Sequence, residues 1–343
     1  MKKRWGYIRL TGMMLLMGGM LVAAVGCGKR KADGAGMAGS ETIILRYGEV
    51  NPEGYFMVDT ANYFAERVKE LSGGHIEVDI CPSQIGDDSK CYQELQMGAL
   101  DLYRGNAVSL AEFQSPELSV LALPYIFRNQ EHFWKVCDSE LGRTLLDNLQ
   151  KSGTEILGLC YLDEGARNFF TSDGPVTRLS DMEGKRIRIM SSQVMIDTIT
   201  ALGAVPSPTA YSEVYTLLES GTITGAGNPV NSYYSNKFYE VAPYLVKDGH
   251  IHAPSVLLMS EITWDHLTED ERAVILQAAR DTEAENRRKI EQSERESYQK
   301  LAEVGVTITE LENPGEWRAA VQGVYEKYGS EYMELINEIQ NMR

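Results

Sequence analysis

From about residue 42 onward, apolar residues recur first with strand spacing and then with helix spacing. Residues 42–47 are strand-like, and the apolar positions up to Leu71 recur at helical spacing before a Ser-Gly-Gly turn. Ile76, Val78 and Ile80 then alternate with polar residues, as in a half-buried strand. A strand, a helix and a strand in this order predict a βαβ unit and a parallel sheet. Ligands of such sheets bind at the carboxyl ends of strands, so we expect the loop after Ile80 to face a cleft.

The middle of the chain continues this mixture of strands and helices. Residues 121–127 and 155–161 are apolar runs of strand length, which predict core strands covered on both faces. Apolar side chains between them, from residue 133 to 149, have helical spacing. Two further helices are expected at about 194–202 and 213–219, each followed by a glycine.

Near the C-terminus a long helix is predicted. Thr268 and Glu271 form a capping box, and the pattern continues for some thirty residues, although apolar positions become sparse after Ala279. A helix with so narrow an apolar stripe must be largely solvated or must bridge two lobes. We expect a last strand around Val306 and terminal helices within residues 317–341.

Residues 1–26 have the pattern of an export signal. Four cations precede or flank the start of an apolar run that ends in small residues directly before Cys27, and the run is too short and glycine-rich for a typical membrane span. This ending resembles a bacterial lipobox, which implies cleavage after Gly26 and lipid on Cys27. An ordinary signal peptide with an incidental cysteine is the alternative. Residues 27–40 are small and polar, as in a flexible tether.

Charge excludes some partners. The formal net charge is −16, and loss of residues 1–26, which contain four cations and no acid, leaves −20. A polyanion of this kind binds nucleic acid and anionic lipid poorly, so we expect no nucleic-acid partner. Residues 34–39 match G-x-G-x-x-G by letter, but no strand precedes them and no helix pattern follows, so we expect no dinucleotide cofactor.

We expect no metal site and no cofactor. The cysteines that remain after Cys27 have no zinc-like spacing; they are Cys81, Cys91, Cys137 and Cys160. Cys81 and Cys91 form either a disulfide or two buried thiols. His250 and His252 would share one face of a strand and could be half of a metal site, but no third clustered ligand is evident.

Groups suited to binding an organic acid are concentrated between Gly165 and Asn231. In the run GKRIRIM, period-two alternation separates Arg186 and Arg188 from the apolar side chains that can pack. A guanidinium presents paired donors that match a carboxylate. Asn228 lies in a glycine-rich turn, where the backbone can approach a ligand closely. Arg167 lies at the start of the same stretch.

Several motifs in this stretch occur together in one known family. GARNFFTSDGPV, KRIRIM, ALGAVPSP, SEVYTLLESG and GAGNPVNSYYSNKFYEVAPY resemble the central block of the solute-binding subunits of TRAP transporters, the tripartite ATP-independent family. The resemblance extends from about Arg46 to the C-terminal helices. It implies an α/β fold of the two-lobed periplasmic-binding-protein type, with a hinge and a long helix bridging both lobes.

The resemblance also implies roles for individual residues. Arg188 would be the carboxylate clamp, Arg167 a second arginine at the site, and Asn228 an amide bonded to the same carboxylate. Tyr211 would stack on the ligand, or be a packed loop aromatic. The remaining implied site residues are Asp88 and Asn106, for hydroxyl or amine groups, and Arg104, a nearby cation whose orientation is open.

Three of these assignments have structural alternatives. Asp87 and Asp88 could simply cap a helix N-terminus. Arg104 could pair with a surface carboxylate. Arg186 is expected to be a solvated or salt-bridged neighbour of the site. The chain also departs from the family, because many relatives have D-G-A-E-N-P where residues 224–229 are T-G-A-G-N-P, so two carboxylates beside the amide are missing.

The implied division has lobe I at residues 41–164 with 254–293, and lobe II at 165–253 with 294–343. We predict a non-enzymatic, monomeric receptor, tethered by lipid to the outer face of the cytoplasmic membrane. It would bind a sugar acid such as a hexuronate, or a dicarboxylate, and deliver it to a TRAP permease driven by an ion gradient. Asp88, Asn106 and Arg104 favour the sugar acid.

Two other functions are open. The same fold could present a ligand to a signalling partner as a sensor module. The chain could also be an exported enzyme acting on a small acid, in which one of Asp163, Glu164 and His250 would serve as acid or base.

Overall fold

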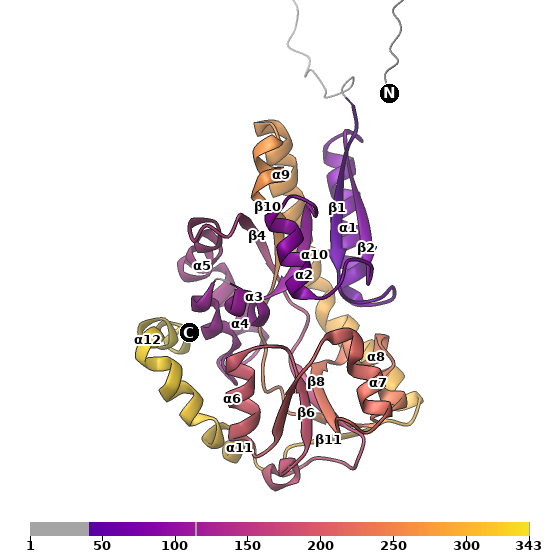
Figure 1. Cartoon of the computed structure of the whole chain (residues 1–343), viewed down its shortest axis with the longest axis vertical. Helices are drawn as coiled ribbons and strands as arrows, with labels where there is room; N and C mark the ends of the chain where they lie inside the picture. Colours follow the sequence, from indigo (N-terminus) through magenta and orange to yellow (C-terminus); the bar gives the residue numbers. More distant parts are fainter. Residues whose placement is uncertain (1–40, 114, 343) are drawn as a thin grey trace, which may run out of the picture. The chain divides into compact units, whose positions relative to one another are not determined.

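In a computed structural model, which describes residues 41–113 and 115–342, the chain forms two β-sheets with helices around them (Figure 1). The first sheet has the order β2-β1-β3-β10-β4. Its strands are β1 (Ile43–Glu49), β2 (Ile76–Pro82), β3 (Leu102–Asn106), β4 (Ile156–Leu162) and β10 (Ser255–Ser260). We call this sheet and its helices lobe I.

The predicted βαβ unit is confirmed. Strand β1 pairs in parallel with β2, and α1 (Phe56–Leu71) connects them. Apolar side chains of α1, among them Val58, Phe64 and Val68, are buried because they recur on the helix face that covers the sheet. The parallel pairing places the carboxyl ends of β1 and β2 at one edge of the sheet.

The second sheet has the order β11-β9-β5-β8-β6-β7. Its strands are β5 (Arg167–Thr171), β6 (Arg186–Ile189), β7 (Val205–Pro208), β8 (Gly225–Pro229), β9 (Tyr244–Lys247) and β11 (Thr307–Glu310). Strand β6 runs parallel to β7 and β8, and β5 runs antiparallel to β8 and β9. We call this sheet and its helices lobe II.

The helices lie around the sheets in chain order. Lobe I has α2 (Asp88–Gln96), α3 (Ala107–Phe113), α4 (Gln130–Asp138), α5 (Glu140–Lys151) and α9 (Glu261–His266). Lobe II has α6 (Gln193–Ala201), α7 (Val214–Glu219), α8 (Val230–Ser235) and α11 (Pro314–Ala320), and α12 (Gln322–Asn341) follows. Short 3₁₀ helices are η1 (Pro116–Ala122), η2 (Leu179–Met182), η3 (Tyr211–Glu213) and η4 (Phe238–Glu240).

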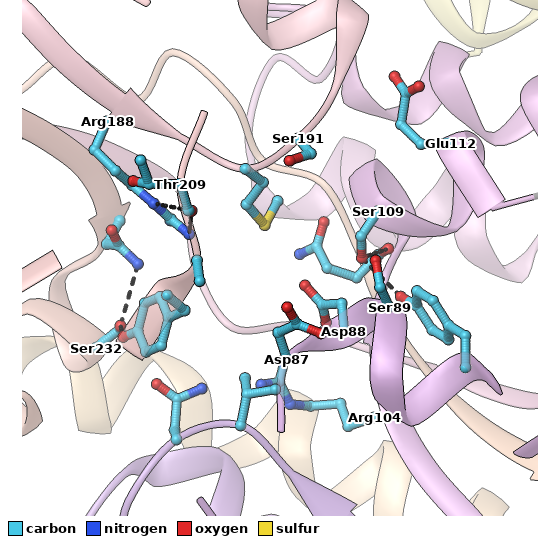
Figure 2. Close-up of a pocket in the computed structure, with 18 of the residues that line it drawn as sticks. Asp87, Asp88, Ser89, Arg104, Ser109, Glu112, Arg188, Ser191, Thr209 and Ser232 are labelled. Carbon is cyan, nitrogen blue, oxygen red and sulfur yellow. Dashed lines mark hydrogen bonds between the residues drawn. The ribbon is translucent and has the colours of Figure 1, made fainter. Parts of the chain in front are cut away.

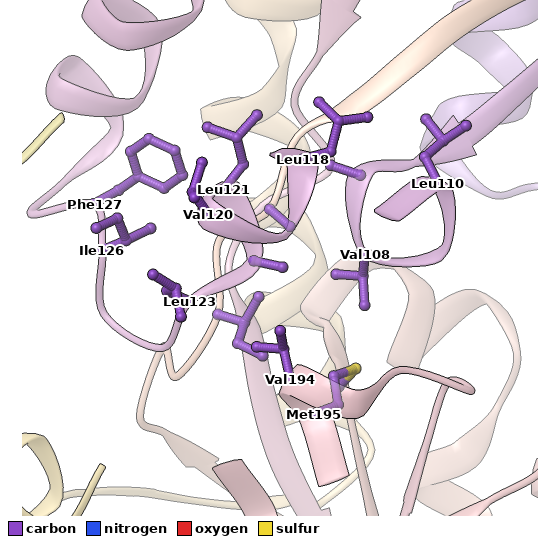
Figure 3. Packing of buried hydrophobic residues seen from close by; sticks show 14 of the residues in the cluster. Val108, Leu110, Leu118, Val120, Leu121, Leu123, Ile126, Phe127, Val194 and Met195 are labelled. Atoms are coloured by element: carbon purple, nitrogen blue, oxygen red, sulfur yellow. The ribbon is translucent and has the colours of Figure 1, made fainter. Parts of the chain in front are cut away.

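The strand predicted at residues 121–127 is wrong. This segment is the end of η1 followed by a loop, in which Tyr125 has a φ of +60°. Its side chains are apolar because they are buried in a cluster, where Leu121 and Leu123 pack with Val194 of α6 (Figure 3). Burial on all sides selects apolar residues in a loop as it does in a buried strand, so composition could not separate the two.

The four cysteines beyond Cys27 are free and buried. Cys81 lies in β2 and Cys91 in α2, and the structure therefore has two thiols where a disulfide was one option. Burial raises the pKa of the Cys91 thiol.

The predicted long helix is α10 (Glu269–Glu303), and it contacts both lobes. The capping box is formed as expected, with Thr268 and Glu271 bonded to each other's backbone N–H. Ile275 packs in the core of lobe I, whereas Leu301 packs in the core of lobe II. The few apolar positions are thus divided between two cores, which explains the narrow stripe.

Two further connections between the lobes lie side by side. Residues 163–166 lead from β4 into β5, and residues 248–254 lead from β9 into β10. The Arg167 backbone N–H donates to the Ile251 carbonyl at 2.7 Å, which joins the two segments. We expect lobe movement to be centred on these connections.

A group of ionisable side chains surrounds the connections. The His252 Nε2 and Asp163 Oδ1 atoms are 2.7 Å apart. Glu294 of α10 lies directly against Gly165, whose φ of +90° and lack of a side chain are both required there. Burial, and then the charge of Asp163, raise the pKa of Glu294 to about 7.

The raised pKa of Glu294 predicts a pH-dependent stability. Because the ordinary value is 4.5, the folded protein holds this proton more tightly than the unfolded chain between pH 4.5 and about 7. Its contribution is therefore present at low pH and is lost as the pH rises. We expect Glu294→Gln to stabilise the protein by about 1–3 kcal/mol at pH 8 and by little at pH 5. Thermal unfolding at both pH values measures this, and an equal change at both would contradict it.

Candidate functional site

A cavity of about 240 Å³ lies between elements of lobe I and lobe II (Figure 2). All seven side chains singled out from the sequence line it. In Figure 2, Arg188, Thr209 and Ser232 of lobe II lie on one side, and Asp88 and Ser89 of lobe I lie on the other. The two sides differ in their charges and in how far their polar atoms are satisfied.

Arg188 lies on β6 with its side chain held in one orientation. The neighbouring Ile187 and Ile189 are buried in the core, as the alternation predicted, and Arg188 is itself only 3% exposed. Its Nε and Nη2 atoms donate to the Thr209 carbonyl at 3.0 and 2.7 Å, while Nη1 has no partner among the described residues. Its Cζ atom lies 5.5 Å from the centre of the Tyr211 ring. Arg186 is exposed, and its guanidinium donates to backbone carbonyls.

Arg167, the first residue of β5, is the second buried guanidinium. Its Nη2 atom donates to the Gly227 carbonyl, and its Nε atom has no partner among the described residues. Neither Arg167 nor Arg188 forms an ion pair with a described carboxylate. Burial, and then the charge of Arg167, lower the pKa of Arg188 to about 10. An anion between the two guanidiniums would relieve this strain.

Lobe II has two further polar atoms without partners at the cavity: the Thr209 Oγ1 and the Asn228 Oδ1. The Asn228 Nδ2 atom is 3.3 Å from the Ser232 hydroxyl, which can either donate or accept. Rotation of the amide by 180° would thus direct its NH₂ group into the cavity. Buried polar atoms without partners are rare in proteins, and these four line one cavity. The arrangement is suited to a polar, anionic ligand.

Arg104 differs from the other two arginines because it is fully paired. Its Nε and Nη2 atoms bond both oxygens of Glu49 at 2.6 Å, and its Nη1 is 3.2 Å from Glu164. Burial would lower the pKa of Arg104, but Glu49 and Glu164 raise it above its ordinary value. Arg104 lines the cavity, yet its charge is neutralised from lobe I, and its partners are buried acids instead of a surface carboxylate.

Asn106 is also engaged within the protein. Its Nδ2 atom donates to Glu164 at 2.5 Å, and its Oδ1 accepts the Val108 N–H at 2.9 Å. Glu164 accepts in addition from the Tyr55 hydroxyl at 2.9 Å. Arg104, Asn106 and Glu164 thus form a closed network beneath the cavity.

The two predicted acids at the start of α2 have different roles. Asp87 is the N-cap, and its side chain accepts the Lys90 N–H at 3.0 Å. Asp88 accepts a hydrogen bond from the Tyr103 hydroxyl and lines the cavity. Burial raises the pKa of Asp88. With Glu112 of α3, these acids make the lobe I side of the cavity negative.

The histidines are not arranged as predicted. His250 and His252 lie in the connection before β10, where Ile251 forms only an isolated bridge. His250 stacks on Phe169 at a ring distance of 3.8 Å and bonds Asp248 through Nδ1 at 2.7 Å. Within residues 41–113 and 115–342, no group of three potential metal ligands occurs.

His250 also explains one departure from the family pattern. A Cβ atom at Gly227 would lie 2.8 Å from the His250 ring, so that position has no room for the glutamate that many relatives have.

Sequence reasoning missed several residues of the cavity. Thr209 precedes Tyr211 by two positions, so strand alternation could have indicated a shared face. Glu49 and Asn51 follow or end β1, where the rule for carboxyl ends of strands could have found them. Glu112 had no signal in the sequence, because its place at the cavity depends on how the lobes meet.

Residues 47–331 match the family model described as bacterial extracellular solute-binding protein, family 7. The chain belongs to this family. Members of family 7 are extracytoplasmic solute-binding proteins. None of the helices in the described part of this family 7 protein is long and apolar enough to cross a membrane.

Relatives extend over most of the family 7 chain. It is 31% identical to a solute-binding protein of Chromohalobacter salexigens, with 83% of this chain and 84% of the relative covered. It is 30% identical to the C4-dicarboxylate-binding protein DctB of Bacillus subtilis, covering 88% and 87%. A TRAP periplasmic solute-binding protein from Bradyrhizobium sp. BTAi1, crystallised with D-galacturonate, has a TM-score of 0.83 and 32% identity, covering 87% and 99%. The expected two-lobed α/β fold and the TRAP assignment are confirmed.

Proposed function

We propose that this protein binds a small organic-acid anion between its lobes and delivers it to a TRAP membrane permease. The observation that supports this most directly is the pair of buried guanidiniums, Arg167 and Arg188, which have no carboxylate partner within the described chain. We call these two residues the arginine clamp. A carboxylate bound between them would accept from Arg188 Nη1 and Arg167 Nε, with Asn228 and Thr209 as further donors.

The energy of such binding is adequate for a scavenging receptor. Micromolar affinity requires about −8 kcal/mol. Hydrogen bonds to charged groups contribute roughly 1.5–3 kcal/mol each when water is excluded. Two such bonds, the amide of Asn228 and a few hydroxyl contacts are therefore sufficient. The overall negative charge of the chain does not prevent this, because the clamp is local and buried.

We infer that the ligand is a sugar acid with one carboxylate. The cavity wall opposite the clamp contains Asp88 and Glu112, which would repel a second carboxylate and would accept hydrogen bonds from hydroxyl groups. The Bradyrhizobium relative holds the hexuronate D-galacturonate. The Bacillus subtilis relative is named for C4-dicarboxylates, so the family accommodates both classes.

We take the protein to bind its ligand without transforming it. The groups considered as acid or base are engaged elsewhere: Asp163 with His252, Glu164 with Arg104, and His250 with Asp248. The proposal also includes the lobe boundaries predicted from the sequence and a monomeric state.

Residues 1–40 lie outside the described part of the chain. For them we propose the signal peptide 1–26, the lipid on Cys27 and the tether 27–40, which together would hold the receptor at the outer face of the cytoplasmic membrane.

Substitution of Arg188 tests the clamp. We expect Arg188→Ala to weaken binding of D-glucuronate or D-galacturonate at least about 100-fold, because a buried charge pair is lost. Arg188→Lys should recover little, since lysine lacks the planar fork. Arg186→Ala, on the exposed side of the same strand, is the matched control and should leave Kd within twofold. Isothermal titration measures all three, and retention of parental affinity by Arg188→Ala would refute the clamp.

Substitution of Asp88 tests the ligand class. At pH 7, Asp88→Asn should improve the affinity for succinate relative to D-glucuronate by about tenfold, because a charge facing the second carboxylate is removed. The ratio of the two Kd values in one protein cancels general effects on folding. An unchanged ratio would mean that Asp88 does not select against dicarboxylates.

A further inference from the structure

A hydrogen bond joins the lobes at the edge of the ligand cavity. Asn51 lies in the loop after β1 of lobe I, and Asn236 directly follows α8 of lobe II. The Asn236 Nδ2 atom is 3.3 Å from the Asn51 Oδ1 atom. The two residues come from elements on different sheets, so this bond exists only when the lobes are together.

Each asparagine is held from behind by a residue of its own lobe. The backbone N–H and Nδ2 of Asn51 both donate to Glu49 Oε1 at 2.9 Å, and Glu49 in turn holds Arg104. Asn236 donates to the Tyr211 hydroxyl at 2.8 Å. Tyr211 is 2.5 Å from the Ser232 hydroxyl, which also contacts Asn228. A continuous chain of hydrogen bonds thus connects the paired arginine of lobe I with the amide beside the clamp.

The Asn236 amide has more acceptors than it can use. Besides Asn51 and Tyr211, its Nδ2 atom lies 3.0 Å from the Ser232 carbonyl and 3.3 Å from the Ser235 hydroxyl. An amide has two hydrogens for these four acceptors. Opening the lobes can therefore exchange the bond to Asn51 for one within lobe II at little cost, as a reversible contact requires.

A second cavity of about 390 Å³ lies beside the first. Asn236 lines the second cavity and Asn51 lines the first. The two cavities share Tyr211, Val50, Asp87 and Ala210, which form the wall between them. Asn51 and Asn236 therefore meet where that wall joins lobe I to lobe II.

We propose that the Asn51–Asn236 hydrogen bond is a latch that keeps the lobes closed over the bound anion and slows its release, an inference that rests on the proposed function. Glu112 makes a second contact across the cavity, to the Gln193 N–H at 2.5 Å, at the start of α6. That contact has no link to Tyr211 or Asn228. Only the asparagine latch is connected to the residues of the clamp.

A double-mutant cycle tests the latch. In stopped-flow displacement of D-glucuronate, Asn51→Ala and Asn236→Ala should each raise koff roughly three- to tenfold. The association rate should change less than twofold, since encounter occurs with the lobes open. The double variant should release ligand no more than twofold faster than the faster single variant. Unchanged koff in the single variants, or a double variant equal to the product of both effects, would overturn the latch.

Ser235→Ala is the matched control, because its hydroxyl contacts the same amide without reaching lobe I. Its koff should stay within twofold of the parent, and a larger increase would assign the effect to lobe II alone. Thermal unfolding verifies that each variant is folded. If an alanine variant does not fold, serine at the same position completes the cycle.

Lobe closure can also be followed without ligand, which separates the latch from the proposed function. Dyes on unnatural amino acids at the exposed positions Met97 and Val205 report the distance between the lobes by energy transfer. The ratio of closed to open protein should fall roughly three- to tenfold in both alanine variants. A parent protein that binds no sugar acid would refute the proposed function, whereas an unchanged ratio would refute the latch.

Discussion

The structure depends on two guanidinium groups that are buried without a carboxylate from the protein. Burial of an uncompensated charge is unfavourable, and Arg188 and Arg167 raise this cost for each other. Carbonyl groups of Thr209 and Gly227 fix both side chains in place, but they do not neutralise them. The missing negative charge is what a small carboxylate can supply, and this makes the cavity a binding site and not merely a gap between lobes.

The rest of the cavity is arranged around this deficit. Lobe I neutralises its own arginine completely through Glu49 and Glu164, so the unsatisfied positive charge is confined to lobe II. The acids facing the clamp, Asp88 and Glu112, then orient a ligand whose other end has hydroxyl groups. Because the two halves of the site lie on separate lobes, full binding requires closure, and closure in turn depends on contacts such as those of Asn51 and Asn236.

Much of this could be predicted from the sequence because it depends on local periodicity. The alternation in GKRIRIM placed Arg188 opposite the packed isoleucines, and the capping box fixed the start of α10. Prediction failed where long-range packing decides the outcome. The apolar loop at residues 121–127 has the composition of a strand, and the pairing of Arg104 depends on Glu49 and Glu164, which are remote in sequence. The role of Gly227 became clear only from the position of His250.

The most direct test of this account is a crystal structure of the protein with bound D-glucuronate. We predict that the carboxylate lies about 3 Å from Arg188 Nη1 and Arg167 Nε, with the hydroxyl groups toward Asp88. A ligand whose carboxylate lies away from both arginines, or an Arg188 side chain turned to bulk water in the complex, would contradict the account.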